Sequence, residues 1–177
     1  MSRPVIFTIG HSTRTTAQFV GLLASHGVQE IVDVRTIPKS RHNPQFNEGA
    51  LRASLVKAGV RYLHLAKLGG LRHARKDSTN LGWRNASFRG YADYMQTADF
   101  EKGLRRLMSV ARARPVAVMC AEAVPWRCHR SLIADALVKQ GWTVRHIQSG
   151  RTANRHTLTP FLRMRRGMIA YPAPSRI

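Results

Sequence analysis

Short apolar segments alternate with amphipathic ones along this chain, and the alternation limits the fold more than any other feature. Between the short segments, apolar residues such as Phe19, Leu22 and Leu23 recur at the spacing of a helix face. Strands separated by helices pair in parallel through right-handed crossovers. The segments expected to be strands are, in chain order, 5–9, 30–34, 60–65, 115–119 and 142–147. The sequence therefore predicts one α/β domain, with a mostly parallel sheet of about five strands and helices on both faces.

Two segments fall outside this alternation. Residues 67–88 show no periodic pattern and contain Gly69, Gly70 and several basic residues, so we expect a long loop there. Residues 151–177 contain six arginines and no acidic residue. We therefore assign residues 1–150 to the α/β domain and residues 151–177 to a basic C-terminal extension.

The charge of the chain indicates an anionic partner. It has 29 Lys and Arg against 9 Asp and Glu, which gives a formal net charge of +20. Such an excess attracts polyanions, so nucleic acid or another phosphate-bearing ligand is the expected partner. A composition rich in arginine and alanine is also typical of a GC-rich genome, and the charge alone does not separate these two explanations.

The sequence indicates neither a membrane nor an export pathway. No apolar run reaches the roughly 18 residues that a membrane span needs. The first residues lack the apolar centre and the cleavage site of a signal peptide, so we expect a cytoplasmic protein with no membrane partner. In that compartment Cys120 and Cys128 are not expected to form a structural disulfide. They are either buried packing residues or chemically active.

Titratable side chains collect where the expected strands end. Ligands of parallel sheets bind beyond the carboxyl ends of the strands. His11 follows the first strand, where it could act as a general base, a phosphate contact or a helix cap. Arg35, Ser40 and Arg41 follow the second strand and suit the binding of phosphate or carboxylate. The alternative is a structural ion pair between Asp33 and one of these arginines.

The densest cluster is MCAEAVPWRCHRS, residues 119–131, where a strand ends and a helix begins. A helix N-terminus and the neighbouring His129 and Arg130 lower the pKa of a thiol, whereas burial raises it. We therefore predict that Cys128 is a more acidic thiol than Cys120. The alternative is that both cysteines are inert and that the segment only packs.

The candidate residues fall into two groups. Glu122, the only acidic residue of the cluster, could be a base or the partner of an arginine. Backbone N–H groups at the start of the helix could hold an anion. The catalytic candidates are Cys120, Cys128, His11 and Glu122, and the anion-binding candidates are Arg35, Ser40, Arg41, His129 and Arg130.

Five segments, IGHST, VDVRTIPKSRHNPQF, LGG, FRGYADYMQ and MCAEAVPWRCHRSLIADAL, resemble in this order the signature of the DUF488 family. The resemblance covers about residues 5–147 and implies a small cytoplasmic α/β protein of a family without a settled activity. The order of strand, Cys120, loop, arginine and helix is also distantly similar to rhodaneses and cysteine phosphatases. The loop is longer here than in those families, since six residues separate Cys120 from Arg127 and nine separate it from Arg130.

Three functions are compatible with these residues. The first is an enzyme that acts on a phosphorylated or nucleic-acid ligand through a cysteine or a His–Glu pair. The second is a nucleic-acid-binding protein without catalysis. The third is a metal-binding protein with Cys120, Cys128 and His129 as ligands, with or without His11. The sequence does not indicate which cofactor, if any, the protein uses.

Overall fold

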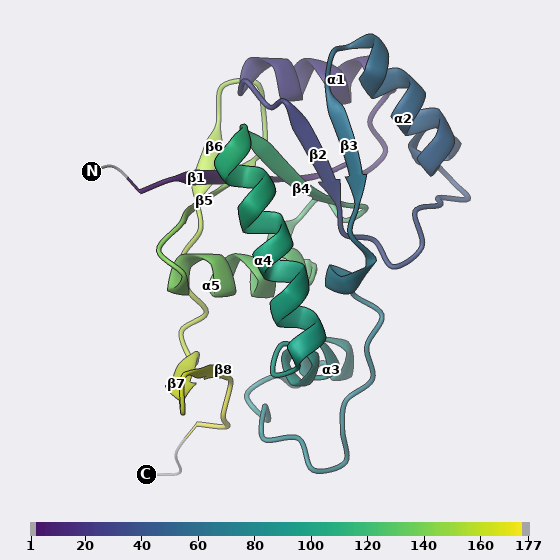
Figure 1. Cartoon of the computed structure of the whole chain (residues 1–177). Coiled ribbons are helices and arrows are strands. Elements are labelled where there is room, and N and C mark those ends of the chain that lie inside the picture. The colour runs from purple at the N-terminus through teal and green to yellow at the C-terminus, as the bar shows by residue number, and fades with distance from the viewer. Residues whose placement is uncertain (1–2, 175–177) are drawn as a thin grey trace.

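The computed structural model describes residues 3–174, and its centre is a sheet of six strands in the order β3-β2-β4-β1-β5-β6 (Figure 1). The strands are β1 (Val5–Gly10), β2 (Glu30–Asp33), β3 (Arg61–His64), β4 (Val116–Cys120), β5 (Thr143–Ile147) and β6 (Ala153–Arg155). The first five are parallel to their neighbours, and β6 is antiparallel to β5. The prediction of a mostly parallel sheet is confirmed. The sixth strand was not expected.

The structure has five α-helices within the described residues, and four of them cover the two faces of the sheet, as the sequence predicts. The five helices are α1 (Thr16–Ser25), α2 (Glu48–Lys57), α3 (Ala86–Tyr94), α4 (Ala98–Ala113) and α5 (Arg130–Lys139). Helices α1 and α2 bury Phe19 and Leu51 against one face, in a cluster with Ile31. The other face packs against α4 and α5 and includes Leu107 and Leu132. Figure 1 shows α4 running across this second face.

The alternation of side chains along β4 decides which residues reach the α5 side of the sheet. Ala117 and Met119 pack in the cluster with α1 and α2, whereas Val118 and Cys120 pack in the cluster with α4 and α5. This is the period of two that a pleated strand imposes. Cys120 is therefore directed toward the segment that leads into α5, where Cys128 lies.

The carboxyl ends of β2, β4 and β1 lie side by side. Asp33 is in register with Met119, and Gly10 is in register with Cys120. The amide of His11 continues this pairing by donating to the carbonyl of Cys120 at 2.9 Å. Parallel pairing thus brings together three segments that are far apart in the sequence.

The segment between β3 and α3 is irregular, as expected for residues 67–88, except that α3 already begins at Ala86. It begins with the short helix η2 (Ala66–Leu68) and lies against α3. The carboxylate of Asp93 on α3 accepts hydrogen bonds from the amide of Arg75, the hydroxyl of Ser78 and the side-chain amide of Asn80. One buried carboxylate therefore fixes this segment in place.

Residues 151–174, the described part of the expected basic extension, also pack against the domain. Besides β6 they form a hairpin of β7 (Arg163–Arg165) and β8 (Met168–Ala170), which lies apart from the main sheet (Figure 1). Tyr171 is fully buried in the core cluster that contains α4 and α5. None of the helices within residues 3–174 has the length and apolar character that crossing a bilayer requires.

Candidate active site

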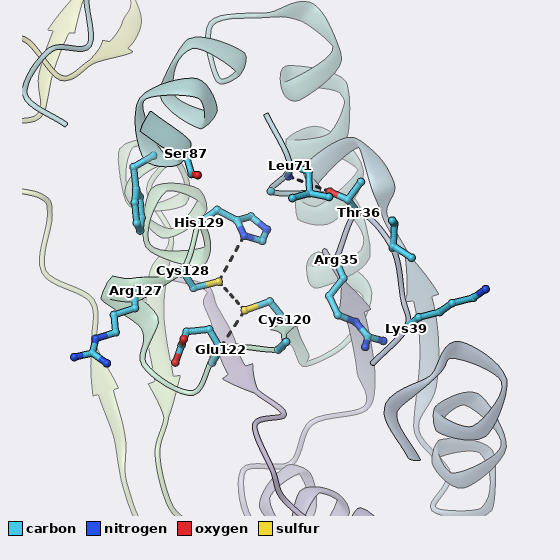
Figure 2. Close-up of a pocket in the computed structure, with 14 residues that line it drawn as sticks. Arg35, Thr36, Lys39, Leu71, Ser87, Cys120, Glu122, Arg127, Cys128 and His129 are labelled. Atoms are coloured by element: carbon cyan, nitrogen blue, oxygen red, sulfur yellow. Dashed lines mark hydrogen bonds between the residues drawn. The ribbon is translucent and has the colours of Figure 1, made fainter. Parts of the chain in front are cut away.

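A pocket of about 390 Å³ opens beyond the carboxyl ends of β2 and β4 (Figure 2). Its walls come from the loops that follow β2, β3 and β4 and from the start of α3. The lining residues are Arg35, Thr36, Ile37, Lys39, Gly70, Leu71, Ser87, Phe88, Cys120, Ala121, Glu122, Arg127, Cys128 and His129. Glu122 is the single acidic residue among them, so the lining carries an excess of positive charge.

The two cysteines meet at the wall of this pocket. The Sγ atoms of Cys120 and Cys128 lie 2.6 Å apart and face each other in Figure 2. Cys120 is the last residue of β4, and Cys128 follows the short helix η3 (Pro125–Arg127) just before α5. Their exposed fractions are only 3% and 6%, but both side chains line the pocket. The site therefore combines a low solvent exposure with access from the pocket.

The ring of His129 is oriented so that it can accept the proton of Cys128. Its Nε2 lies 3.1 Å from the carbonyl oxygen of Val34, and a carbonyl only accepts, so Nε2 carries a hydrogen. In the neutral ring Nδ1 is then the basic nitrogen, and it lies 3.5 Å from the Sγ of Cys128. A thiol, a base and a group that orients the base form the arrangement that activates a nucleophile.

The two thiols differ in acidity in the direction that the sequence predicts. The pKa of Cys128 is well below its usual value because Cys120 donates a hydrogen bond to its sulfur, with His129 and Arg130 adding to the effect against burial. The pKa of Cys120 is well above its usual value, first because the thiol is buried and second because it is the donor to Cys128. Cys128 is therefore the more acidic thiol of the pair.

Arg130 lies beneath the pocket and is not one of its lining residues. Its Nε donates to the Sγ of Cys120 at 3.0 Å, and one terminal nitrogen donates to the hydroxyl of Thr8 at 3.0 Å. The other donates to the carbonyls of Glu122 and Ala123. Burial alone would lower the pKa of this fully buried guanidinium, but the two sulfurs raise it. Arg130 thus holds the loop and the thiols rather than a ligand.

Arg35 lines the pocket and also forms the ion pair that the sequence leaves as an alternative. Its Nε and one terminal nitrogen donate to the carboxylate of Asp33, the closest contact being 2.6 Å. The same nitrogen donates to the carbonyl of Phe46, and the hydroxyl of Tyr62 donates to Asp33. The second terminal nitrogen lies 3.5 Å from Nε2 of His11. Most of the hydrogen-bonding capacity of Arg35 is therefore used within the protein.

The other expected residues lie beside the pocket. His11 is buried, its ring is stacked on Phe46 at a centroid distance of 4.3 Å, and its Nδ1 donates to the carbonyl of Ser12. Ser40 lies in the loop after β2, where its amide donates to Asn47. Arg41 is exposed in the same loop. None of the three expected residues lines the pocket. The structure thus brings Cys120, Cys128, Glu122, His129 and Arg35 together and leaves His11, Ser40, Arg41 and Arg130 outside the lining.

A comparison with family models identifies the family of this chain. Residues 15–137, more than half of the chain, match the model described as Domain of unknown function DUF488. The chain belongs to the DUF488 family. Neither a search of curated proteins nor a search of solved structures found a match. The matched region of this DUF488 protein includes both cysteines, His129 and Arg130.

Sequence reasoning missed several residues that line the pocket. Lys39 precedes Ser40 in the loop after β2, and Arg127 precedes Cys128. Both missed residues are therefore sequence neighbours of residues that were predicted. Thr36 follows Arg35 directly and accepts a hydrogen bond from the amide of Leu71. The position of Ser87 in the lining depends on where α3 begins, and no local pattern indicates that.

Two glycines permit the close packing around the thiols. A Cβ atom on Gly70 would lie 2.5 Å from Nδ1 of His129, so any side chain there would displace the ring. A Cβ atom on Gly10 would overlap the carbonyl of Glu122, because the loop after β4 crosses the end of β1 at that point. Both glycines are required by close approach rather than by an unusual backbone conformation.

The structure does not support the third of the expected functions, a metal site. Within residues 3–174, no group of three or more His, Cys, Asp or Glu side chains has an arrangement that could hold a metal ion. The Nε2 of His129 is also directed to a backbone carbonyl, so only its Nδ1 remains near the sulfurs.

Proposed function

We propose that this DUF488 protein is a cysteine-dependent enzyme that acts on a phosphate-bearing ligand bound in the pocket, with Cys128 as the nucleophile and His129 as its base. The observation that carries the proposal is the contact between Cys128 Sγ and Nδ1 of His129, with the opposite ring nitrogen fixed on the carbonyl of Val34. The hydrogen bond to Val34 leaves Nδ1 as the nitrogen that faces the sulfur. The contact lies in the wall of a pocket, where a ligand can reach the sulfur.

The environment of Cys128 favours the thiolate over the thiol. The thiol of Cys120 lies within hydrogen-bond distance of Cys128 Sγ, and the amide of Arg130 at the start of α5 donates to the same sulfur at 3.5 Å. The N-terminus of a helix adds a favourable field for negative charge. The proton that leaves Cys128 passes to Nδ1 of His129. The thiolate then forms a bond to the electrophilic centre of the ligand while the bond from that centre to the leaving group breaks. The leaving group takes the proton from His129.

The positive charge at the rim of the pocket supports a phosphate-bearing ligand. Lys39 and Arg127 are both exposed. In Figure 2 they lie on different sides of the pocket with their charged ends directed away from the cysteines. Neither forms an ion pair with another residue of the described chain. Arginine and lysine at such positions bind phosphate through charge-assisted hydrogen bonds. The hydroxyl groups of Thr36 and Ser87 in the lining are further candidates for contact with the ligand.

Alkylation of the thiols tests the proposal. Iodoacetamide should modify the native protein at Cys128 well below the usual pKa of a thiol, and the Cys128→Ser variant should lose this reaction. Phosphate or a nucleotide should slow the reaction. The combined Lys39→Gln and Arg127→Gln variant should lose this protection, whereas Arg41→Gln should retain it because Arg41 is exposed outside the pocket. Modification only after denaturation would overturn the assignment of Cys128 as nucleophile.

A nucleic-acid-binding function without catalysis is the second candidate. The net charge of +20 favours it. The two candidates differ in their dependence on Cys128. The Cys128→Ser variant should bind nucleic acid with unchanged affinity, since attraction between phosphates and surface charges does not depend on a thiol.

A further inference from the structure

We propose that Cys120 and Cys128 form a reversible redox site, which a hydroperoxide oxidises to an intramolecular disulfide that switches the nucleophile off, and that Arg130 makes this disulfide easy to reduce. The proposal rests on the proposed function in one respect, because both require a thiolate at Cys128. It goes further in giving Cys120 a chemical task of its own.

The two sulfurs are already in contact in the reduced protein. Cys120 belongs to the end of β4, and Cys128 belongs to the turn before α5, yet their Sγ atoms lie 2.6 Å apart. Arg130 holds both partners, since its Nε donates to Cys120 Sγ and its amide donates to Cys128 Sγ. Two sulfurs in direct contact can form a disulfide, whereas cysteines that lie far apart cannot do so without movement of the backbone.

The positions of the two cysteines assign their roles. Cys128 is in contact with His129 and is the thiolate, and a thiolate that a small oxidant can reach is the form that reacts. The sulfur of Cys120 lies 2.6 Å from that of Cys128, which is the position of a resolving cysteine. The low exposure of the pair restricts access to small molecules that enter through the pocket.

The reaction has two steps. The thiolate of Cys128 attacks the terminal oxygen of the hydroperoxide, so that an S–O bond forms and the O–O bond breaks. The departing alkoxide or hydroxide takes the proton from His129, and Cys128 becomes a sulfenic acid. The sulfur of Cys120 then attacks Sγ of Cys128, an S–S bond forms, and the S–O bond breaks. Hydroxide leaves with the proton of Cys120 as water, and the two sulfurs have supplied both electrons that reduce the peroxide.

Arg130 makes the oxidised state unfavourable. Besides Cys120 Sγ, its side chain donates only to neutral oxygens, namely the hydroxyl of Thr8 and the carbonyls of Glu122 and Ala123. Across the described residues, no carboxylate forms an ion pair with it. The guanidinium contacts the thiol of Cys120, and the thiolate of Cys128 lies 2.6 Å beyond that sulfur. This thiolate is the negative charge near the guanidinium, and a disulfide removes it. A buried cation without a partner is costly, so oxidation should destabilise the fold.

This consequence distinguishes the site from a structural disulfide. A disulfide ordinarily stabilises a protein because it restricts the unfolded chain. Here the closed loop is short, because Cys120 and Cys128 are eight residues apart, and the loss of the charge at Arg130 acts against it. Since the reduced form is the stabilised one, a small thiol in modest excess should restore it.

The full-length protein treated with hydrogen peroxide provides the test. Intact-mass analysis should show the loss of two hydrogens and no free thiol, and glutathione should reverse the change. In Cys120→Ser, dimedone should trap a sulfenic acid at Cys128, because no resolving thiol remains. The melting temperature of the oxidised wild type should be lower than that of the reduced wild type.

The replacement of Arg130 separates the charge effect from the disulfide itself. In Arg130→Met the lowering of the melting temperature on oxidation should disappear, whereas Arg130→Lys, which keeps the charge, should retain it. If neither variant folds, the melting temperatures of the two wild-type forms still decide the question. Conversion of Cys128 in the wild type to sulfinic acid without a disulfide would overturn the redox site. A higher melting temperature after oxidation would overturn the role of Arg130.

The outcomes also separate this inference from the proposed function. If the disulfide forms as described but phosphate gives no protection against alkylation, the redox site is supported and the proposed phosphate-dependent enzyme is contradicted. If Cys128 is alkylated and phosphate protects it as expected, but peroxide yields only sulfinic acid, the proposed enzyme is supported and the redox site is contradicted.

Discussion

Gly70 shows how a residue without a side chain can control the chemistry of a thiol. The His129 ring occupies the space that a Cβ atom on Gly70 would fill. The same ring contacts Cys128 Sγ through Nδ1 and the carbonyl of Val34 through Nε2. The position of the base is therefore set jointly by a carbonyl that attracts one nitrogen and by a glycine that leaves room for the other.

Gly70→Ala should consequently weaken the activation of Cys128. The methyl group must displace the ring from the sulfur, so the pKa of Cys128 should rise and its alkylation near pH 7 should slow about three- to tenfold. The rate of iodoacetamide modification as a function of pH measures this. Gly21→Ala on α1 is the matched control, because a Cβ atom there meets nothing within 4 Å. Equal rates in the two variants would contradict the role assigned to Gly70.

A buried hydrogen-bonded chain extends from Arg130 into the C-terminal part of the molecule. The hydroxyl of Thr8 lies 2.7 Å from Nδ1 of His146, and Nε2 of His146 lies 2.9 Å from Nδ1 of His156. The remaining nitrogen of His156 lies 2.8 Å from the carboxylate of Asp135. Since Thr8 accepts from Arg130, its hydroxyl hydrogen is free to bind His146, and a neutral His146 fits the chain.

The neutral state of His146 predicts a loss of stability in acid. Burial, with smaller effects from His156 and Arg130, lowers the pKa of His146 to about 3. The unfolded chain binds a proton at this histidine below about pH 6.5, whereas the folded chain does not. The free energy of unfolding should therefore fall by about 1.4 kcal/mol per pH unit between about pH 6 and pH 4 on account of His146 alone. Urea denaturation should show a shallower pH dependence in His146→Gln, and equal slopes would contradict this.

At the scale of secondary-structure elements, residues 148–174 pack against the rest of the fold. Strand β6 extends the sheet, and Tyr171 donates from its amide to Asn80 and from its hydroxyl to Asp135. Asp135 lies on α5, directly after which the chain forms β5. The C-terminal segment thus contacts both the irregular segment before α3 and the helix that begins at the thiols.

Removal of the Tyr171 hydroxyl tests this attachment. Tyr171→Phe leaves one oxygen of the buried Asp135 carboxylate without a donor, so we expect a loss of about 1.5–3 kcal/mol in the free energy of unfolding. Tyr91→Phe is the comparison, because Tyr91 is equally buried but donates to the carbonyl of Leu68. It should cost less, about 0.5–1.5 kcal/mol. Both values come from urea denaturation, and a smaller loss for Tyr171→Phe would contradict the assigned role.

The sequence allows the central strands to be predicted because they are apolar segments bounded by glycine and by helical patterns. Strand β6, by contrast, is three residues long and includes Asn154 and Arg155, which carry no apolar alternation. The Cys120–Cys128 pair could be selected as a site because both residues adjoin one predicted strand and helix. The role of Gly70 and the orientation of His129 could not, because they depend on contacts between segments far apart in the chain.

At the scale of the whole molecule, the net charge of +20 dominates long-range interactions. Arginines on exposed surfaces include Arg41, Arg61 and Arg84, which lie in separate parts of the fold. Surface charge of this kind attracts polyanions over roughly 10 Å at ordinary ionic strength. It does not by itself select a sequence or a structure in a nucleic acid.

Salt dependence separates binding to nucleic acid from an effect of composition. We expect oligonucleotides of unrelated sequence to bind at low salt, with a steep linear fall of log K against log salt concentration. The slope should be the same in Cys128→Ser, since that residue lies in the pocket wall. Fluorescence anisotropy at several salt concentrations measures both. Failure to bind at the lowest salt concentration would leave the charge as a feature of composition alone.

The dependence of His129 on remote segments also has a kinetic consequence. Cys120 and Cys128 are close in the sequence, but Val34 and Gly70, which fix the ring of His129, lie far from them and follow β2 and β3. Contacts between distant segments of parallel sheets form slowly during folding. Cys128 should therefore acquire its acidity only when the chain has assembled its non-local strand pairs. Its rate of reaction with a fast thiol reagent, applied in pulses during refolding, then reports when that assembly is complete.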